Sequence, residues 1–317
     1  MKPRLLVTGA NGFVGQALCG EALKQQYSVT TVTRKKFHIL GQLQNVVIER
    51  YQDALTLSKA LSQVDVVIHL AARVHVMNES ENDALAAYRR VNVQNTLELA
   101  SAAVTAGVKR FLYLSSIKVN GEETFPGKPF TADDVPLPQD PYGISKLEAE
   151  TALLEFGKAN GMEVVIIRPP LVYGPGVGAN FAAMMRAVSS GIPLPLGAIE
   201  NRRSMVAIEN LVDLTLLCTQ HPLAPGKVFL VSDDQDVSLS NLLRKLIAMM
   251  KVRTLLIPIP VPLIRFIAQV LGKANVAQRL CGSLQVDIQK TKDLLGWRPA
   301  LTLDQGLQKT VRWHEKK

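Results

Sequence analysis

Apolar residues in the first half of the chain fall into short runs that alternate with longer segments of helical spacing. Six of these runs have the length and composition of buried strands. The six runs span residues 4–9, 27–34, 45–53, 64–72, 110–116 and 162–170. Helical segments fall between several of them, over 13–25, 87–107 and 145–161. This alternation predicts an α/β fold, in which helices cover both faces of a doubly wound parallel sheet.

The pattern changes after Arg168, where loops dense in Pro and Gly replace the alternation. Helical spacing returns in segments such as 238–250, for which Ser238 or Ser240 is the candidate N-cap. We therefore expect a large sheet domain followed by a smaller, mixed C-terminal domain. The predicted sheet domain spans residues 1–168, with a returning segment near 205–235, and the second domain spans 169–204 and 236–317.

Composition and charge exclude several classes of protein. The 317 residues are 47% hydrophobic, which is enough for a large core. The net charge of +9 suits an anionic ligand, but the cations are scattered without interleaved aromatic residues, so no nucleic-acid partner is expected. Cys19, Cys218 and Cys281 are too widely spaced for a disulfide framework or a zinc pattern. We expect no metal site and a reducing, cytoplasmic location.

The apolar stretch 254–272 comes nearest to a membrane span, but it contains three prolines and Arg265. We expect a buried loop that leads into a helix, and no stable membrane insertion. Docking on a membrane surface through the amphipathic second half is the minor alternative. At the N-terminus, Lys2 and Arg4 precede only a short apolar run that ends in glycines, which is unlike a signal peptide.

Three glycines stand between the first strand and the first helix, at Gly9, Gly12 and Gly15. A strand, a glycine loop and a helix form the setting in which a pyrophosphate binds at a helix N-terminus. Gly9 permits a tight turn, Gly12 lets the backbone approach the phosphates, and Gly15 lets the helix pack closely. The spacing is one residue longer than the common G-x-G-x-x-G. The loop predicts a Rossmann-type dinucleotide-binding sheet.

The end of the second predicted strand bears on the choice of dinucleotide. An acidic residue there would bond the ribose 2′-hydroxyl of NAD. This chain instead has Thr33, Arg34, Lys35 and Lys36. Arg34 is the best candidate for a 2′-phosphate, because guanidinium and phosphate pair in a bidentate way. The sequence favours NADP(H), with NAD(H) as the alternative.

Tyr142 and Lys146 are one helical turn apart and share a face. A lysine cation near a tyrosine, together with a positive nicotinamide, would lower the pKa of the phenol from about 10 and suit it for proton exchange with an alcohol oxygen. Ser116 follows the fifth strand, at the carboxyl edge where parallel sheets bind ligands. We expect Ser116 to hydrogen-bond the reacting oxygen.

Motifs along nearly the whole chain resemble the extended short-chain dehydrogenases/reductases of the NAD(P)-dependent sugar-nucleotide epimerase/dehydratase family. They are TGANGFVG, Asp53 after the third strand, VIHLAA, Val91-Asn92, LSSIKVNG, PYGISK, RPPLVYGPG, RSMVAIENLVD and DIQKTKDLLGW. The stretches LSSIKVNGE, PPLVYGPGVGANF and GIPLPLGAIENRRS further resemble the branch found in bacterial O-antigen clusters, whose members are labelled epimerases or resemble 4-ketoreductases.

The resemblance implies roles for individual residues. The catalytic residues it implies are Ser116, Tyr142 and Lys146. The expected cofactor-binding residues are Gly9, Asn11, Gly12, Phe13, Val14, Gly15, Thr33, Arg34, Asp53, Leu70, Ala71, Ala72, Tyr142, Lys146, Pro169 and Val172. The expected substrate-binding residues are Ser116, Asn180, Arg203 and Arg279.

Three chemistries of this family compete for the site. A dehydratase needs an Asp-Glu pair directly after the serine, where this chain has Ile117 and Lys118, so dehydration is not expected. The absent NAD-type acid and Asn120, in place of the family's aromatic residue, favour NADPH-dependent reduction. The resemblance implies that the C4 ketone of a UDP-4-keto-6-deoxy-N-acetylhexosamine is reduced to a UDP-N-acetyl-6-deoxyhexosamine, such as a quinovosamine.

Two other functions stay open. One is an NAD-dependent UDP-hexose or UDP-N-acetylhexosamine 4-epimerase, and the other is a non-catalytic NADP-binding sensor. The Tyr142–Lys146 pair favours an enzyme, because such sensors usually lack it. The family often dimerises, so a homodimer is a further expectation, without a sequence signal of its own.

Overall fold

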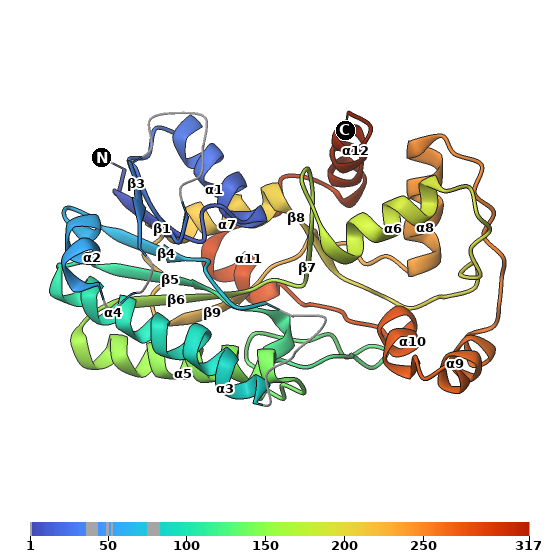
Figure 1. Ribbon diagram of the computed structural model, residues 1–317, viewed down its shortest axis with the longest axis horizontal. Helices are drawn as coiled ribbons and strands as arrows, with labels where there is room; N and C mark the ends of the chain where they lie inside the picture. The colour runs from blue at the N-terminus through green and yellow to red at the C-terminus, as the bar shows by residue number, and fades with distance from the viewer. Residues whose placement is uncertain (1, 36–43, 49–50, 52, 75–82, 317) are drawn as a thin grey trace.

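The structure is a computed structural model that describes residues 2–35, 44–48, 51, 53–74 and 83–316 (Figure 1). The strands are β1 (Leu5–Thr8), β2 (Val29–Thr33), β3 (Gln44–Val47), β4 (Val66–His69), β5 (Arg110–Leu114), β6 (Glu163–Arg168), β7 (Leu171–Tyr173), β8 (Met205–Ala207) and β9 (Lys227–Leu230). The helices that accompany the first six strands are α1 (Phe13–Lys24), α2 (Ala54–Leu61), α3 (Ala84–Arg89), a π-helical turn (Arg90–Gln94), α4 (Asn95–Thr105), a 3₁₀ turn (Ile117–Val119) and α5 (Pro141–Asn160).

The remaining helices belong to the second half of the chain. They are α6 (Ala179–Ser189), α7 (Ile208–Cys218), α8 (Leu239–Met250), α9 (Val261–Val270), α10 (Ala274–Cys281), α11 (Gln289–Leu295) and α12 (Leu303–His314).

The main sheet has seven strands in the order β3-β2-β1-β4-β5-β6-β9, and every pairing is parallel. Strand order reverses at β1, so the chain crosses from one half of the sheet to the other between β3 and β4, as in a doubly wound fold. The predicted Rossmann-type α/β class is confirmed. β9 is a seventh strand that the sequence pattern did not show, because its four residues are too few for a periodic signal.

Each face of the sheet has its own hydrophobic core. One core packs α1 and α7 on the sheet, with Leu18 and Leu211 fully buried. The other packs α2, α4 and α5, with Leu57, Leu99 and Leu153 fully buried. Figure 1 shows the two layers on opposite sides of the sheet. A sheet covered on both faces requires strands that are apolar on both faces, which is the pattern the sequence carries.

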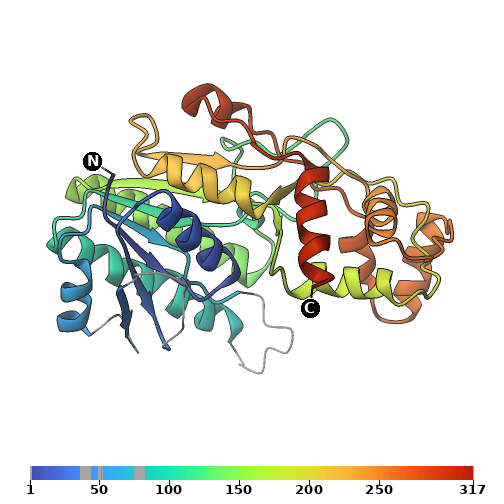
Figure 2. The same cartoon turned by 90° about the horizontal axis from the view of Figure 1, so that it is seen from above.

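The second part of the chain begins directly after the carboxyl end of β6 and forms a third hydrophobic core. This core packs α6, α8 and α12 around the short β7–β8 pair, with Tyr173 and Phe181 stacked inside it. Figure 2 shows this part beside the sheet rather than on one of its faces. It therefore lies at the carboxyl edge of the sheet, where a parallel sheet binds its ligands.

The return of the chain to the sheet is longer than the sequence indicates. β9 pairs with β6, within the predicted returning segment. Beyond that segment, α11 packs against β9, and Ile288, Leu295 and Trp297 belong to the sheet core. Sequence analysis placed residues 236–317 together in the second domain. The difference arises because α11 is one short helix whose apolar face is partnered only through long-range contacts.

The structure refines two sequence-based expectations about helices. Residues 84–105 are helical throughout, as expected over most of 87–107, but Arg90–Gln94 within them form a π-helical turn between α3 and α4. In the stretch 254–272 a loop leads into α9, as expected, but only Thr254 of the loop is buried, so its expected burial is wrong. No residue of α9 is buried either. Only a narrow stripe that includes Ile264 packs against the third core. Among the described residues, no helix has the length and apolarity needed to cross a membrane.

Candidate active site

The glycine loop between β1 and α1 is tight enough to require glycine at two positions. Gly9 has φ +67°, and a Cβ there would lie 2.8 Å from the backbone nitrogen of Ala71. A Cβ on Gly15 would lie 2.2 Å from the carbonyl oxygen of Gly9. Gly12 donates its N–H to the same carbonyl at 2.9 Å and is the N-cap of α1. The first and third glycines thus serve chain conformation and packing, as the spacing predicts.

The N-terminus of α1 suits a bound pyrophosphate. Gly12 provides no side-chain cap, and the first turn holds no acidic residue. The first N–H groups of a helix have no acceptor within the helix, and its dipole makes this end positive. Phe13 and Val14 form this turn and are half-buried, so their N–H groups are placed for an anion. Asn11 is exposed within the loop and accepts a hydrogen bond from Gln16 on its carbonyl oxygen.

The segment Leu70–Ala72 lies directly against the glycine loop. The Ala71 N–H donates to Thr8 Oγ1 at 3.3 Å, and all three residues are half-buried. Phe13 contacts the loop after β7, because a Cβ on Gly176 would lie 3.8 Å from its ring. The structure therefore brings together the segments after β1 and β4 that the sequence expected to line one cofactor site. It adds the loop after β7, to which the sequence analysis gave no role.

The end of β2 places a cation near the glycine loop. Thr33 is buried, whereas Arg34 and Lys35 are exposed; Lys36 lies outside the described residues. Burial raises the pKa of Tyr51 to about 12, while a hydrogen bond with Thr8 and the charge of Arg34 oppose that rise. The charge of Arg34 therefore acts on Tyr51, and Tyr51 forms a hydrogen bond with Thr8, the residue before Gly9.

Asp53 follows β3 and caps the next helix. Its carboxylate accepts a hydrogen bond from the Thr56 N–H at 3.1 Å, and this bond lowers its pKa. The side chain is exposed, beyond the ends of β2 and β3. The carboxylate serves as the N-cap of α2. Its expected role at the adenine remains a prediction.

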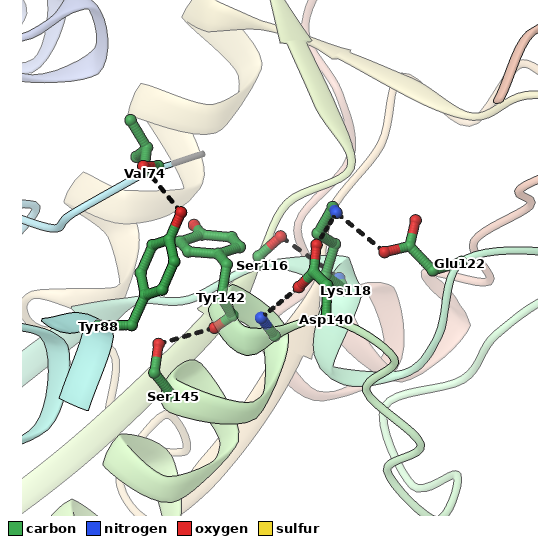
Figure 3. Close-up of polar contacts among 9 residues, drawn as sticks. Val74, Tyr88, Ser116, Lys118, Glu122, Asp140, Tyr142 and Ser145 are labelled. Atoms are coloured by element: carbon green, nitrogen blue, oxygen red, sulfur yellow. Dashed lines mark hydrogen bonds and ion pairs between the residues drawn. The ribbon is translucent and has the colours of Figure 1, made fainter. Parts of the chain in front are cut away.

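Ser116, Tyr142 and Lys146 come together from two elements. Figure 3 shows Ser116 beside Tyr142. Ser116 follows β5 and begins the 3₁₀ turn, where its hydroxyl accepts from the Lys118 N–H at 3.3 Å. Tyr142 and Lys146 lie on the first turns of α5. The Lys146 ammonium is 5.9 Å from the centroid of the Tyr142 ring, and a hydrogen bond links Tyr142 with Ser116. The predicted juxtaposition is present in the structure.

The protein's own groups raise the pKa of Tyr142, whereas the expected lowering depended on a positive nicotinamide as well. Burial of its hydroxyl raises the pKa above the usual value near 10, although part of the side chain remains accessible. The hydrogen bond with Ser116 lowers it, and the negative charge of Asp140 raises it further. The protein's own groups therefore keep Tyr142 as a neutral phenol at neutral pH, because desolvation outweighs the hydrogen bond with Ser116. A neutral phenol is a proton donor.

Lys146 is fully buried on the other side of Tyr142. Its ammonium donates to the carbonyl oxygen of Leu114 at 2.8 Å and lies 4.4 Å from the centroid of the Tyr113 ring. Burial lowers the pKa of Lys146 to about 7, and the charge of Glu150 opposes this. Because a lysine so poised is only partly charged at neutral pH, it is a weaker electrostatic partner for Tyr142 than the sequence implied.

An ion pair to which sequence analysis gave no role fixes α5 on the sheet. Arg168, at the end of β6, contacts Glu150 on α5 with its Nη2 2.5 Å from Oε2, and the two side chains are 4% and 2% exposed. Arg168 also donates to Asn120 Oδ1 at 3.0 Å. Asn120 thus completes this buried network, although the sequence marked it only as a departure from the family. Glu150, the member of the network on α5, lies one turn beyond Lys146.

Asn92 is a second polar link to α5. Its amide donates to Ser145 Oγ at 2.9 Å, and its Oδ1 accepts from the Arg73 N–H at 2.8 Å. Asn92 lies in the π-helical turn, a form found often at functional sites. It thereby ties the segment after β4 to the helix that carries Tyr142. The Val91-Asn92 motif was the only signal of it in the sequence.

Lys118 occupies a position where a dehydratase would carry an acid. Its ammonium contacts Asp140 and lies 2.9 Å from Glu122. Asp140 in turn caps α5 by accepting the Gly143 N–H at 2.7 Å. Lys118 therefore positions the start of the helix that holds Tyr142 (Figure 3). No cluster of three or more metal-ligating side chains occurs within the described part of the chain.

The predicted substrate residues lie in the second part of the chain. Asn180 is exposed on the first turn of α6. Arg203 precedes β8 and donates to the carbonyl oxygen of Arg279 at 2.7 Å. The backbone of Arg279 is thereby tied to Arg203, and its side chain is exposed.

Two further predicted residues, Pro169 and Val172, connect the sheet to this part. The carbonyl oxygen of Pro169 accepts from the Ile117 N–H at 3.0 Å, next to Ser116, and Val172 is half-buried in β7. The cofactor and substrate roles of these residues stay predictions.

The fold, the glycine loop and the Ser116–Tyr142–Lys146 arrangement define an NAD(P)-dependent oxidoreductase of the Rossmann type. The model of the NAD dependent epimerase/dehydratase family matches residues 5–232, and the chain belongs to this family. It is 45% identical over 316 residues to a UDP-glucose 4-epimerase of Vibrio cholerae, a match that covers 98% of this chain and 95% of that protein.

Two other similarities extend over nearly the whole chain. A GDP-6-deoxy-D-mannose reductase of Pseudomonas aeruginosa is 28% identical over 320 residues, which cover 97% of this chain and 96% of that protein. The structure of MoeE5 in complex with UDP-glucuronic acid and NAD matches with a TM-score of 0.80 and 25% identity, over 99% of both chains. The proteins that resemble this chain thus include an epimerase and a reductase of sugar nucleotides, and the predicted family is confirmed.

Proposed function

We propose that this chain reduces the C4 ketone of a UDP-4-keto-6-deoxy-N-acetylhexosamine with NADPH. The product is a UDP-N-acetyl-6-deoxyhexosamine of the quinovosamine type, for use in a bacterial surface polysaccharide. The observation that carries the choice of reduction is Arg34, a cation at the end of β2 close to the glycine loop. A 2′-phosphate there favours NADPH, the usual donor for a one-way reduction.

The side chains of the site support the transfer of one proton to the substrate oxygen. When bound, the nicotinamide supplies the hydride to sugar C4. Tyr142 is a neutral phenol, so it can donate its proton to O4 as the carbonyl becomes an alcohol, and solvent then restores that proton. Ser116 orients and polarises the carbonyl from the end of β5. Lys146 positions Tyr142 and is placed to hold the cofactor ribose.

The fit of this chain to the cofactor rests on the glycine loop and the start of α1. Gly9 and Gly15 make a cradle that any Cβ would fill. The uncapped first turn of α1 presents N–H groups to a pyrophosphate.

Replacement of Arg34 by Ser tests the choice of NADPH. We expect the Kd of NADPH to rise by about 10- to 100-fold, because a charge-assisted hydrogen bond contributes about 1.5–3 kcal/mol. The Kd of NADH should change by less than about threefold, since NADH has no 2′-phosphate to lose its partner. Fluorescence titration of each reduced cofactor measures both constants.

Lys24→Ser is the matched control for Arg34→Ser. Lys24 is exposed on α1, so the variant removes one positive charge from the same sheet unit. It should leave both constants within about twofold, since an exposed charge beyond contact distance is screened by salt. Equal losses for NADPH and NADH in Arg34→Ser would remove the argument for a 2′-phosphate contact.

A direct assay tests the reaction itself. Purified protein is mixed with NADPH and a UDP-4-keto-6-deoxy-N-acetylhexosamine, and the absorbance of NADPH is followed. We expect stoichiometric oxidation of NADPH and a sugar product reduced at C4. Interconversion of UDP-GlcNAc and UDP-GalNAc without net oxidation of NADPH would show an epimerase instead. Binding of the cofactor without turnover of either substrate would show a sensor.

A 4-epimerase is the second candidate, and the relative from Vibrio cholerae favours it. Such an enzyme oxidises C4 and reduces the resulting ketone from the other face, so Tyr142 would have to accept and return a proton. We place reduction ahead of epimerisation because Arg34, at the end of β2, favours NADPH, whereas a 4-epimerase of this kind uses NAD.

A further inference from the structure

The side of α9 that faces solvent carries a continuous apolar stripe. Leu263, Phe266, Ile267, Val270 and Leu271 recur at the spacing of one helical face, and we call them the α9 stripe. They are between 46% and 71% exposed. Soluble proteins seldom leave contiguous apolar patches uncovered unless the patch binds a partner or a membrane.

The α9 stripe is separate from the part of α9 that packs on the protein. Val261 and Ile264, which are half-buried, contact the third hydrophobic core along one edge of the helix. On the neighbouring helix α10, Val276 is 52% exposed and adds to the apolar surface. α9 and α10 lie at the end of the molecule away from the sheet (Figures 1 and 2). The stripe is therefore not the core face of a loosely placed helix, because the core face is already in use.

The charge of the surrounding segment has one sign. Residues 237–286 contain seven Lys or Arg residues and no Asp or Glu, so seven of the nine net positive charges fall in these 50 residues. Arg265 on α9 and Lys273 just after the helix, which we call the basic rim, are both exposed. Lys273 stands between α9 and α10, directly after the stripe.

We propose that the α9 stripe and the basic rim seat this protein on an anionic lipid bilayer, with α9 lying in the plane of the interface. Apolar side chains of such a helix enter the boundary between headgroups and acyl chains, while nearby cations meet lipid phosphates. A second copy of the chain is a poorer occupant, because the same face would bring two sets of positive charges together. None of the residues in the stripe or the rim belongs to the catalytic arrangement, so the proposal stands independently of the proposed reaction.

Cosedimentation with vesicles tests the proposal on the full chain. Vesicles of phosphatidylglycerol and phosphatidylcholine in equal parts provide the anionic surface, and pure phosphatidylcholine provides the neutral one. We expect binding to the anionic vesicles that weakens as salt is raised, and little binding to the neutral ones. The double variant Phe266→Asp/Val270→Asp should bind at least about tenfold more weakly, because it removes apolar insertion and repels the surface.

The matched control is Leu55→Asp/Leu223→Asp. Leu55 and Leu223 are 70% and 55% exposed, similar to Phe266 and Val270 at 64% and 71%, but lie outside α9 and α10. This variant should bind vesicles as the unchanged protein does. The titration of NADPH checks that both double variants remain folded. A further variant, Phe266→Trp, should show a blue shift of its emission on anionic vesicles only, which reports insertion at the stripe itself.

Three results would overturn the proposal. The first is absence of binding to anionic vesicles at low salt by the unchanged protein. The second is equal binding by the two double variants. The third is a dimer in solution that Phe266→Asp/Val270→Asp converts to a monomer, since the stripe would then be covered by a second copy. Each of these outcomes leaves the NADPH assay unaffected, so the proposed reaction is judged separately.

Discussion

Replacement of Tyr142 by Phe should lower kcat by about 10²–10⁴-fold while the Kd of NADPH stays within about threefold, the range expected for loss of a general acid. The phenol shares a hydrogen bond with Ser116, and burial keeps it protonated at neutral pH. The ring itself remains, so the packing of α5 against Tyr88 is retained. Single-turnover oxidation of NADPH with the keto sugar, together with cofactor titration, measures both quantities.

Tyr88→Phe is the control for Tyr142→Phe. The two rings lie 6.1 Å apart between centroids, so this variant removes a neighbouring hydroxyl from the same surroundings. It should change kcat by less than about tenfold, because general acid catalysis requires direct contact with the reacting oxygen. Turnover by Tyr142→Phe at the rate of the unchanged protein would refute the assignment of the proton donor.

Replacement of Arg168 by Met should lower the free energy of unfolding by about 3–5 kcal/mol, because it leaves Glu150 buried without its partner. Both side chains are nearly inaccessible to water, and no solvent can take the place of the guanidinium. The loss should exceed that of most surface substitutions, which stay within about 0.5 kcal/mol. Urea denaturation followed by circular dichroism measures the change.

Two further variants show whether the loss of stability comes from leaving the Glu150 charge buried without a partner or from losing side-chain contacts in general. The double variant Arg168→Met/Glu150→Leu should recover most of the stability, since apolar groups can replace a buried ion pair at little cost. Arg89→Met breaks a more exposed pair between α3 and Glu148, which lies on α5 as Glu150 does. This variant should lower the free energy of unfolding by at most about 1 kcal/mol. If Arg168→Met and Arg89→Met were equally destabilising, the buried pair would have no special role.

Local patterns in the sequence were sufficient for most of the sheet and for the cofactor loop. The strands β1, β2, β4, β5 and β6 fall within predicted runs, because a strand buried on both faces must be apolar throughout. Gly161 ends α5 at φ +68°, as a helix terminus of this kind requires. Ser238 caps α8, one of the two candidates that the sequence offered. Each of these features depends on a few neighbouring residues, so a linear pattern carries it.

Features that depend on distant parts of the chain were predicted less well. The single helix expected over 87–107 is interrupted by a π-helical turn, at which Asn92 reaches Ser145 on α5. The role of Asn120 was hidden because its partner Arg168 lies 48 residues away. The four residues of β9 form a strand because they pair with β6, which is far away in the sequence.

The sequence by itself determined that strands alternate with helices, that Gly9 and Gly15 shape a tight loop before the first helix, and that Ser116, Tyr142 and Lys146 meet at one edge of the sheet. These follow from spacing and from the rule that parallel strands end together. Only the tertiary structure decided the direction in which the pKa of Tyr142 shifts and left the α9 stripe exposed. Desolvation and exposure depend on everything that surrounds a group, and no local pattern contains that information.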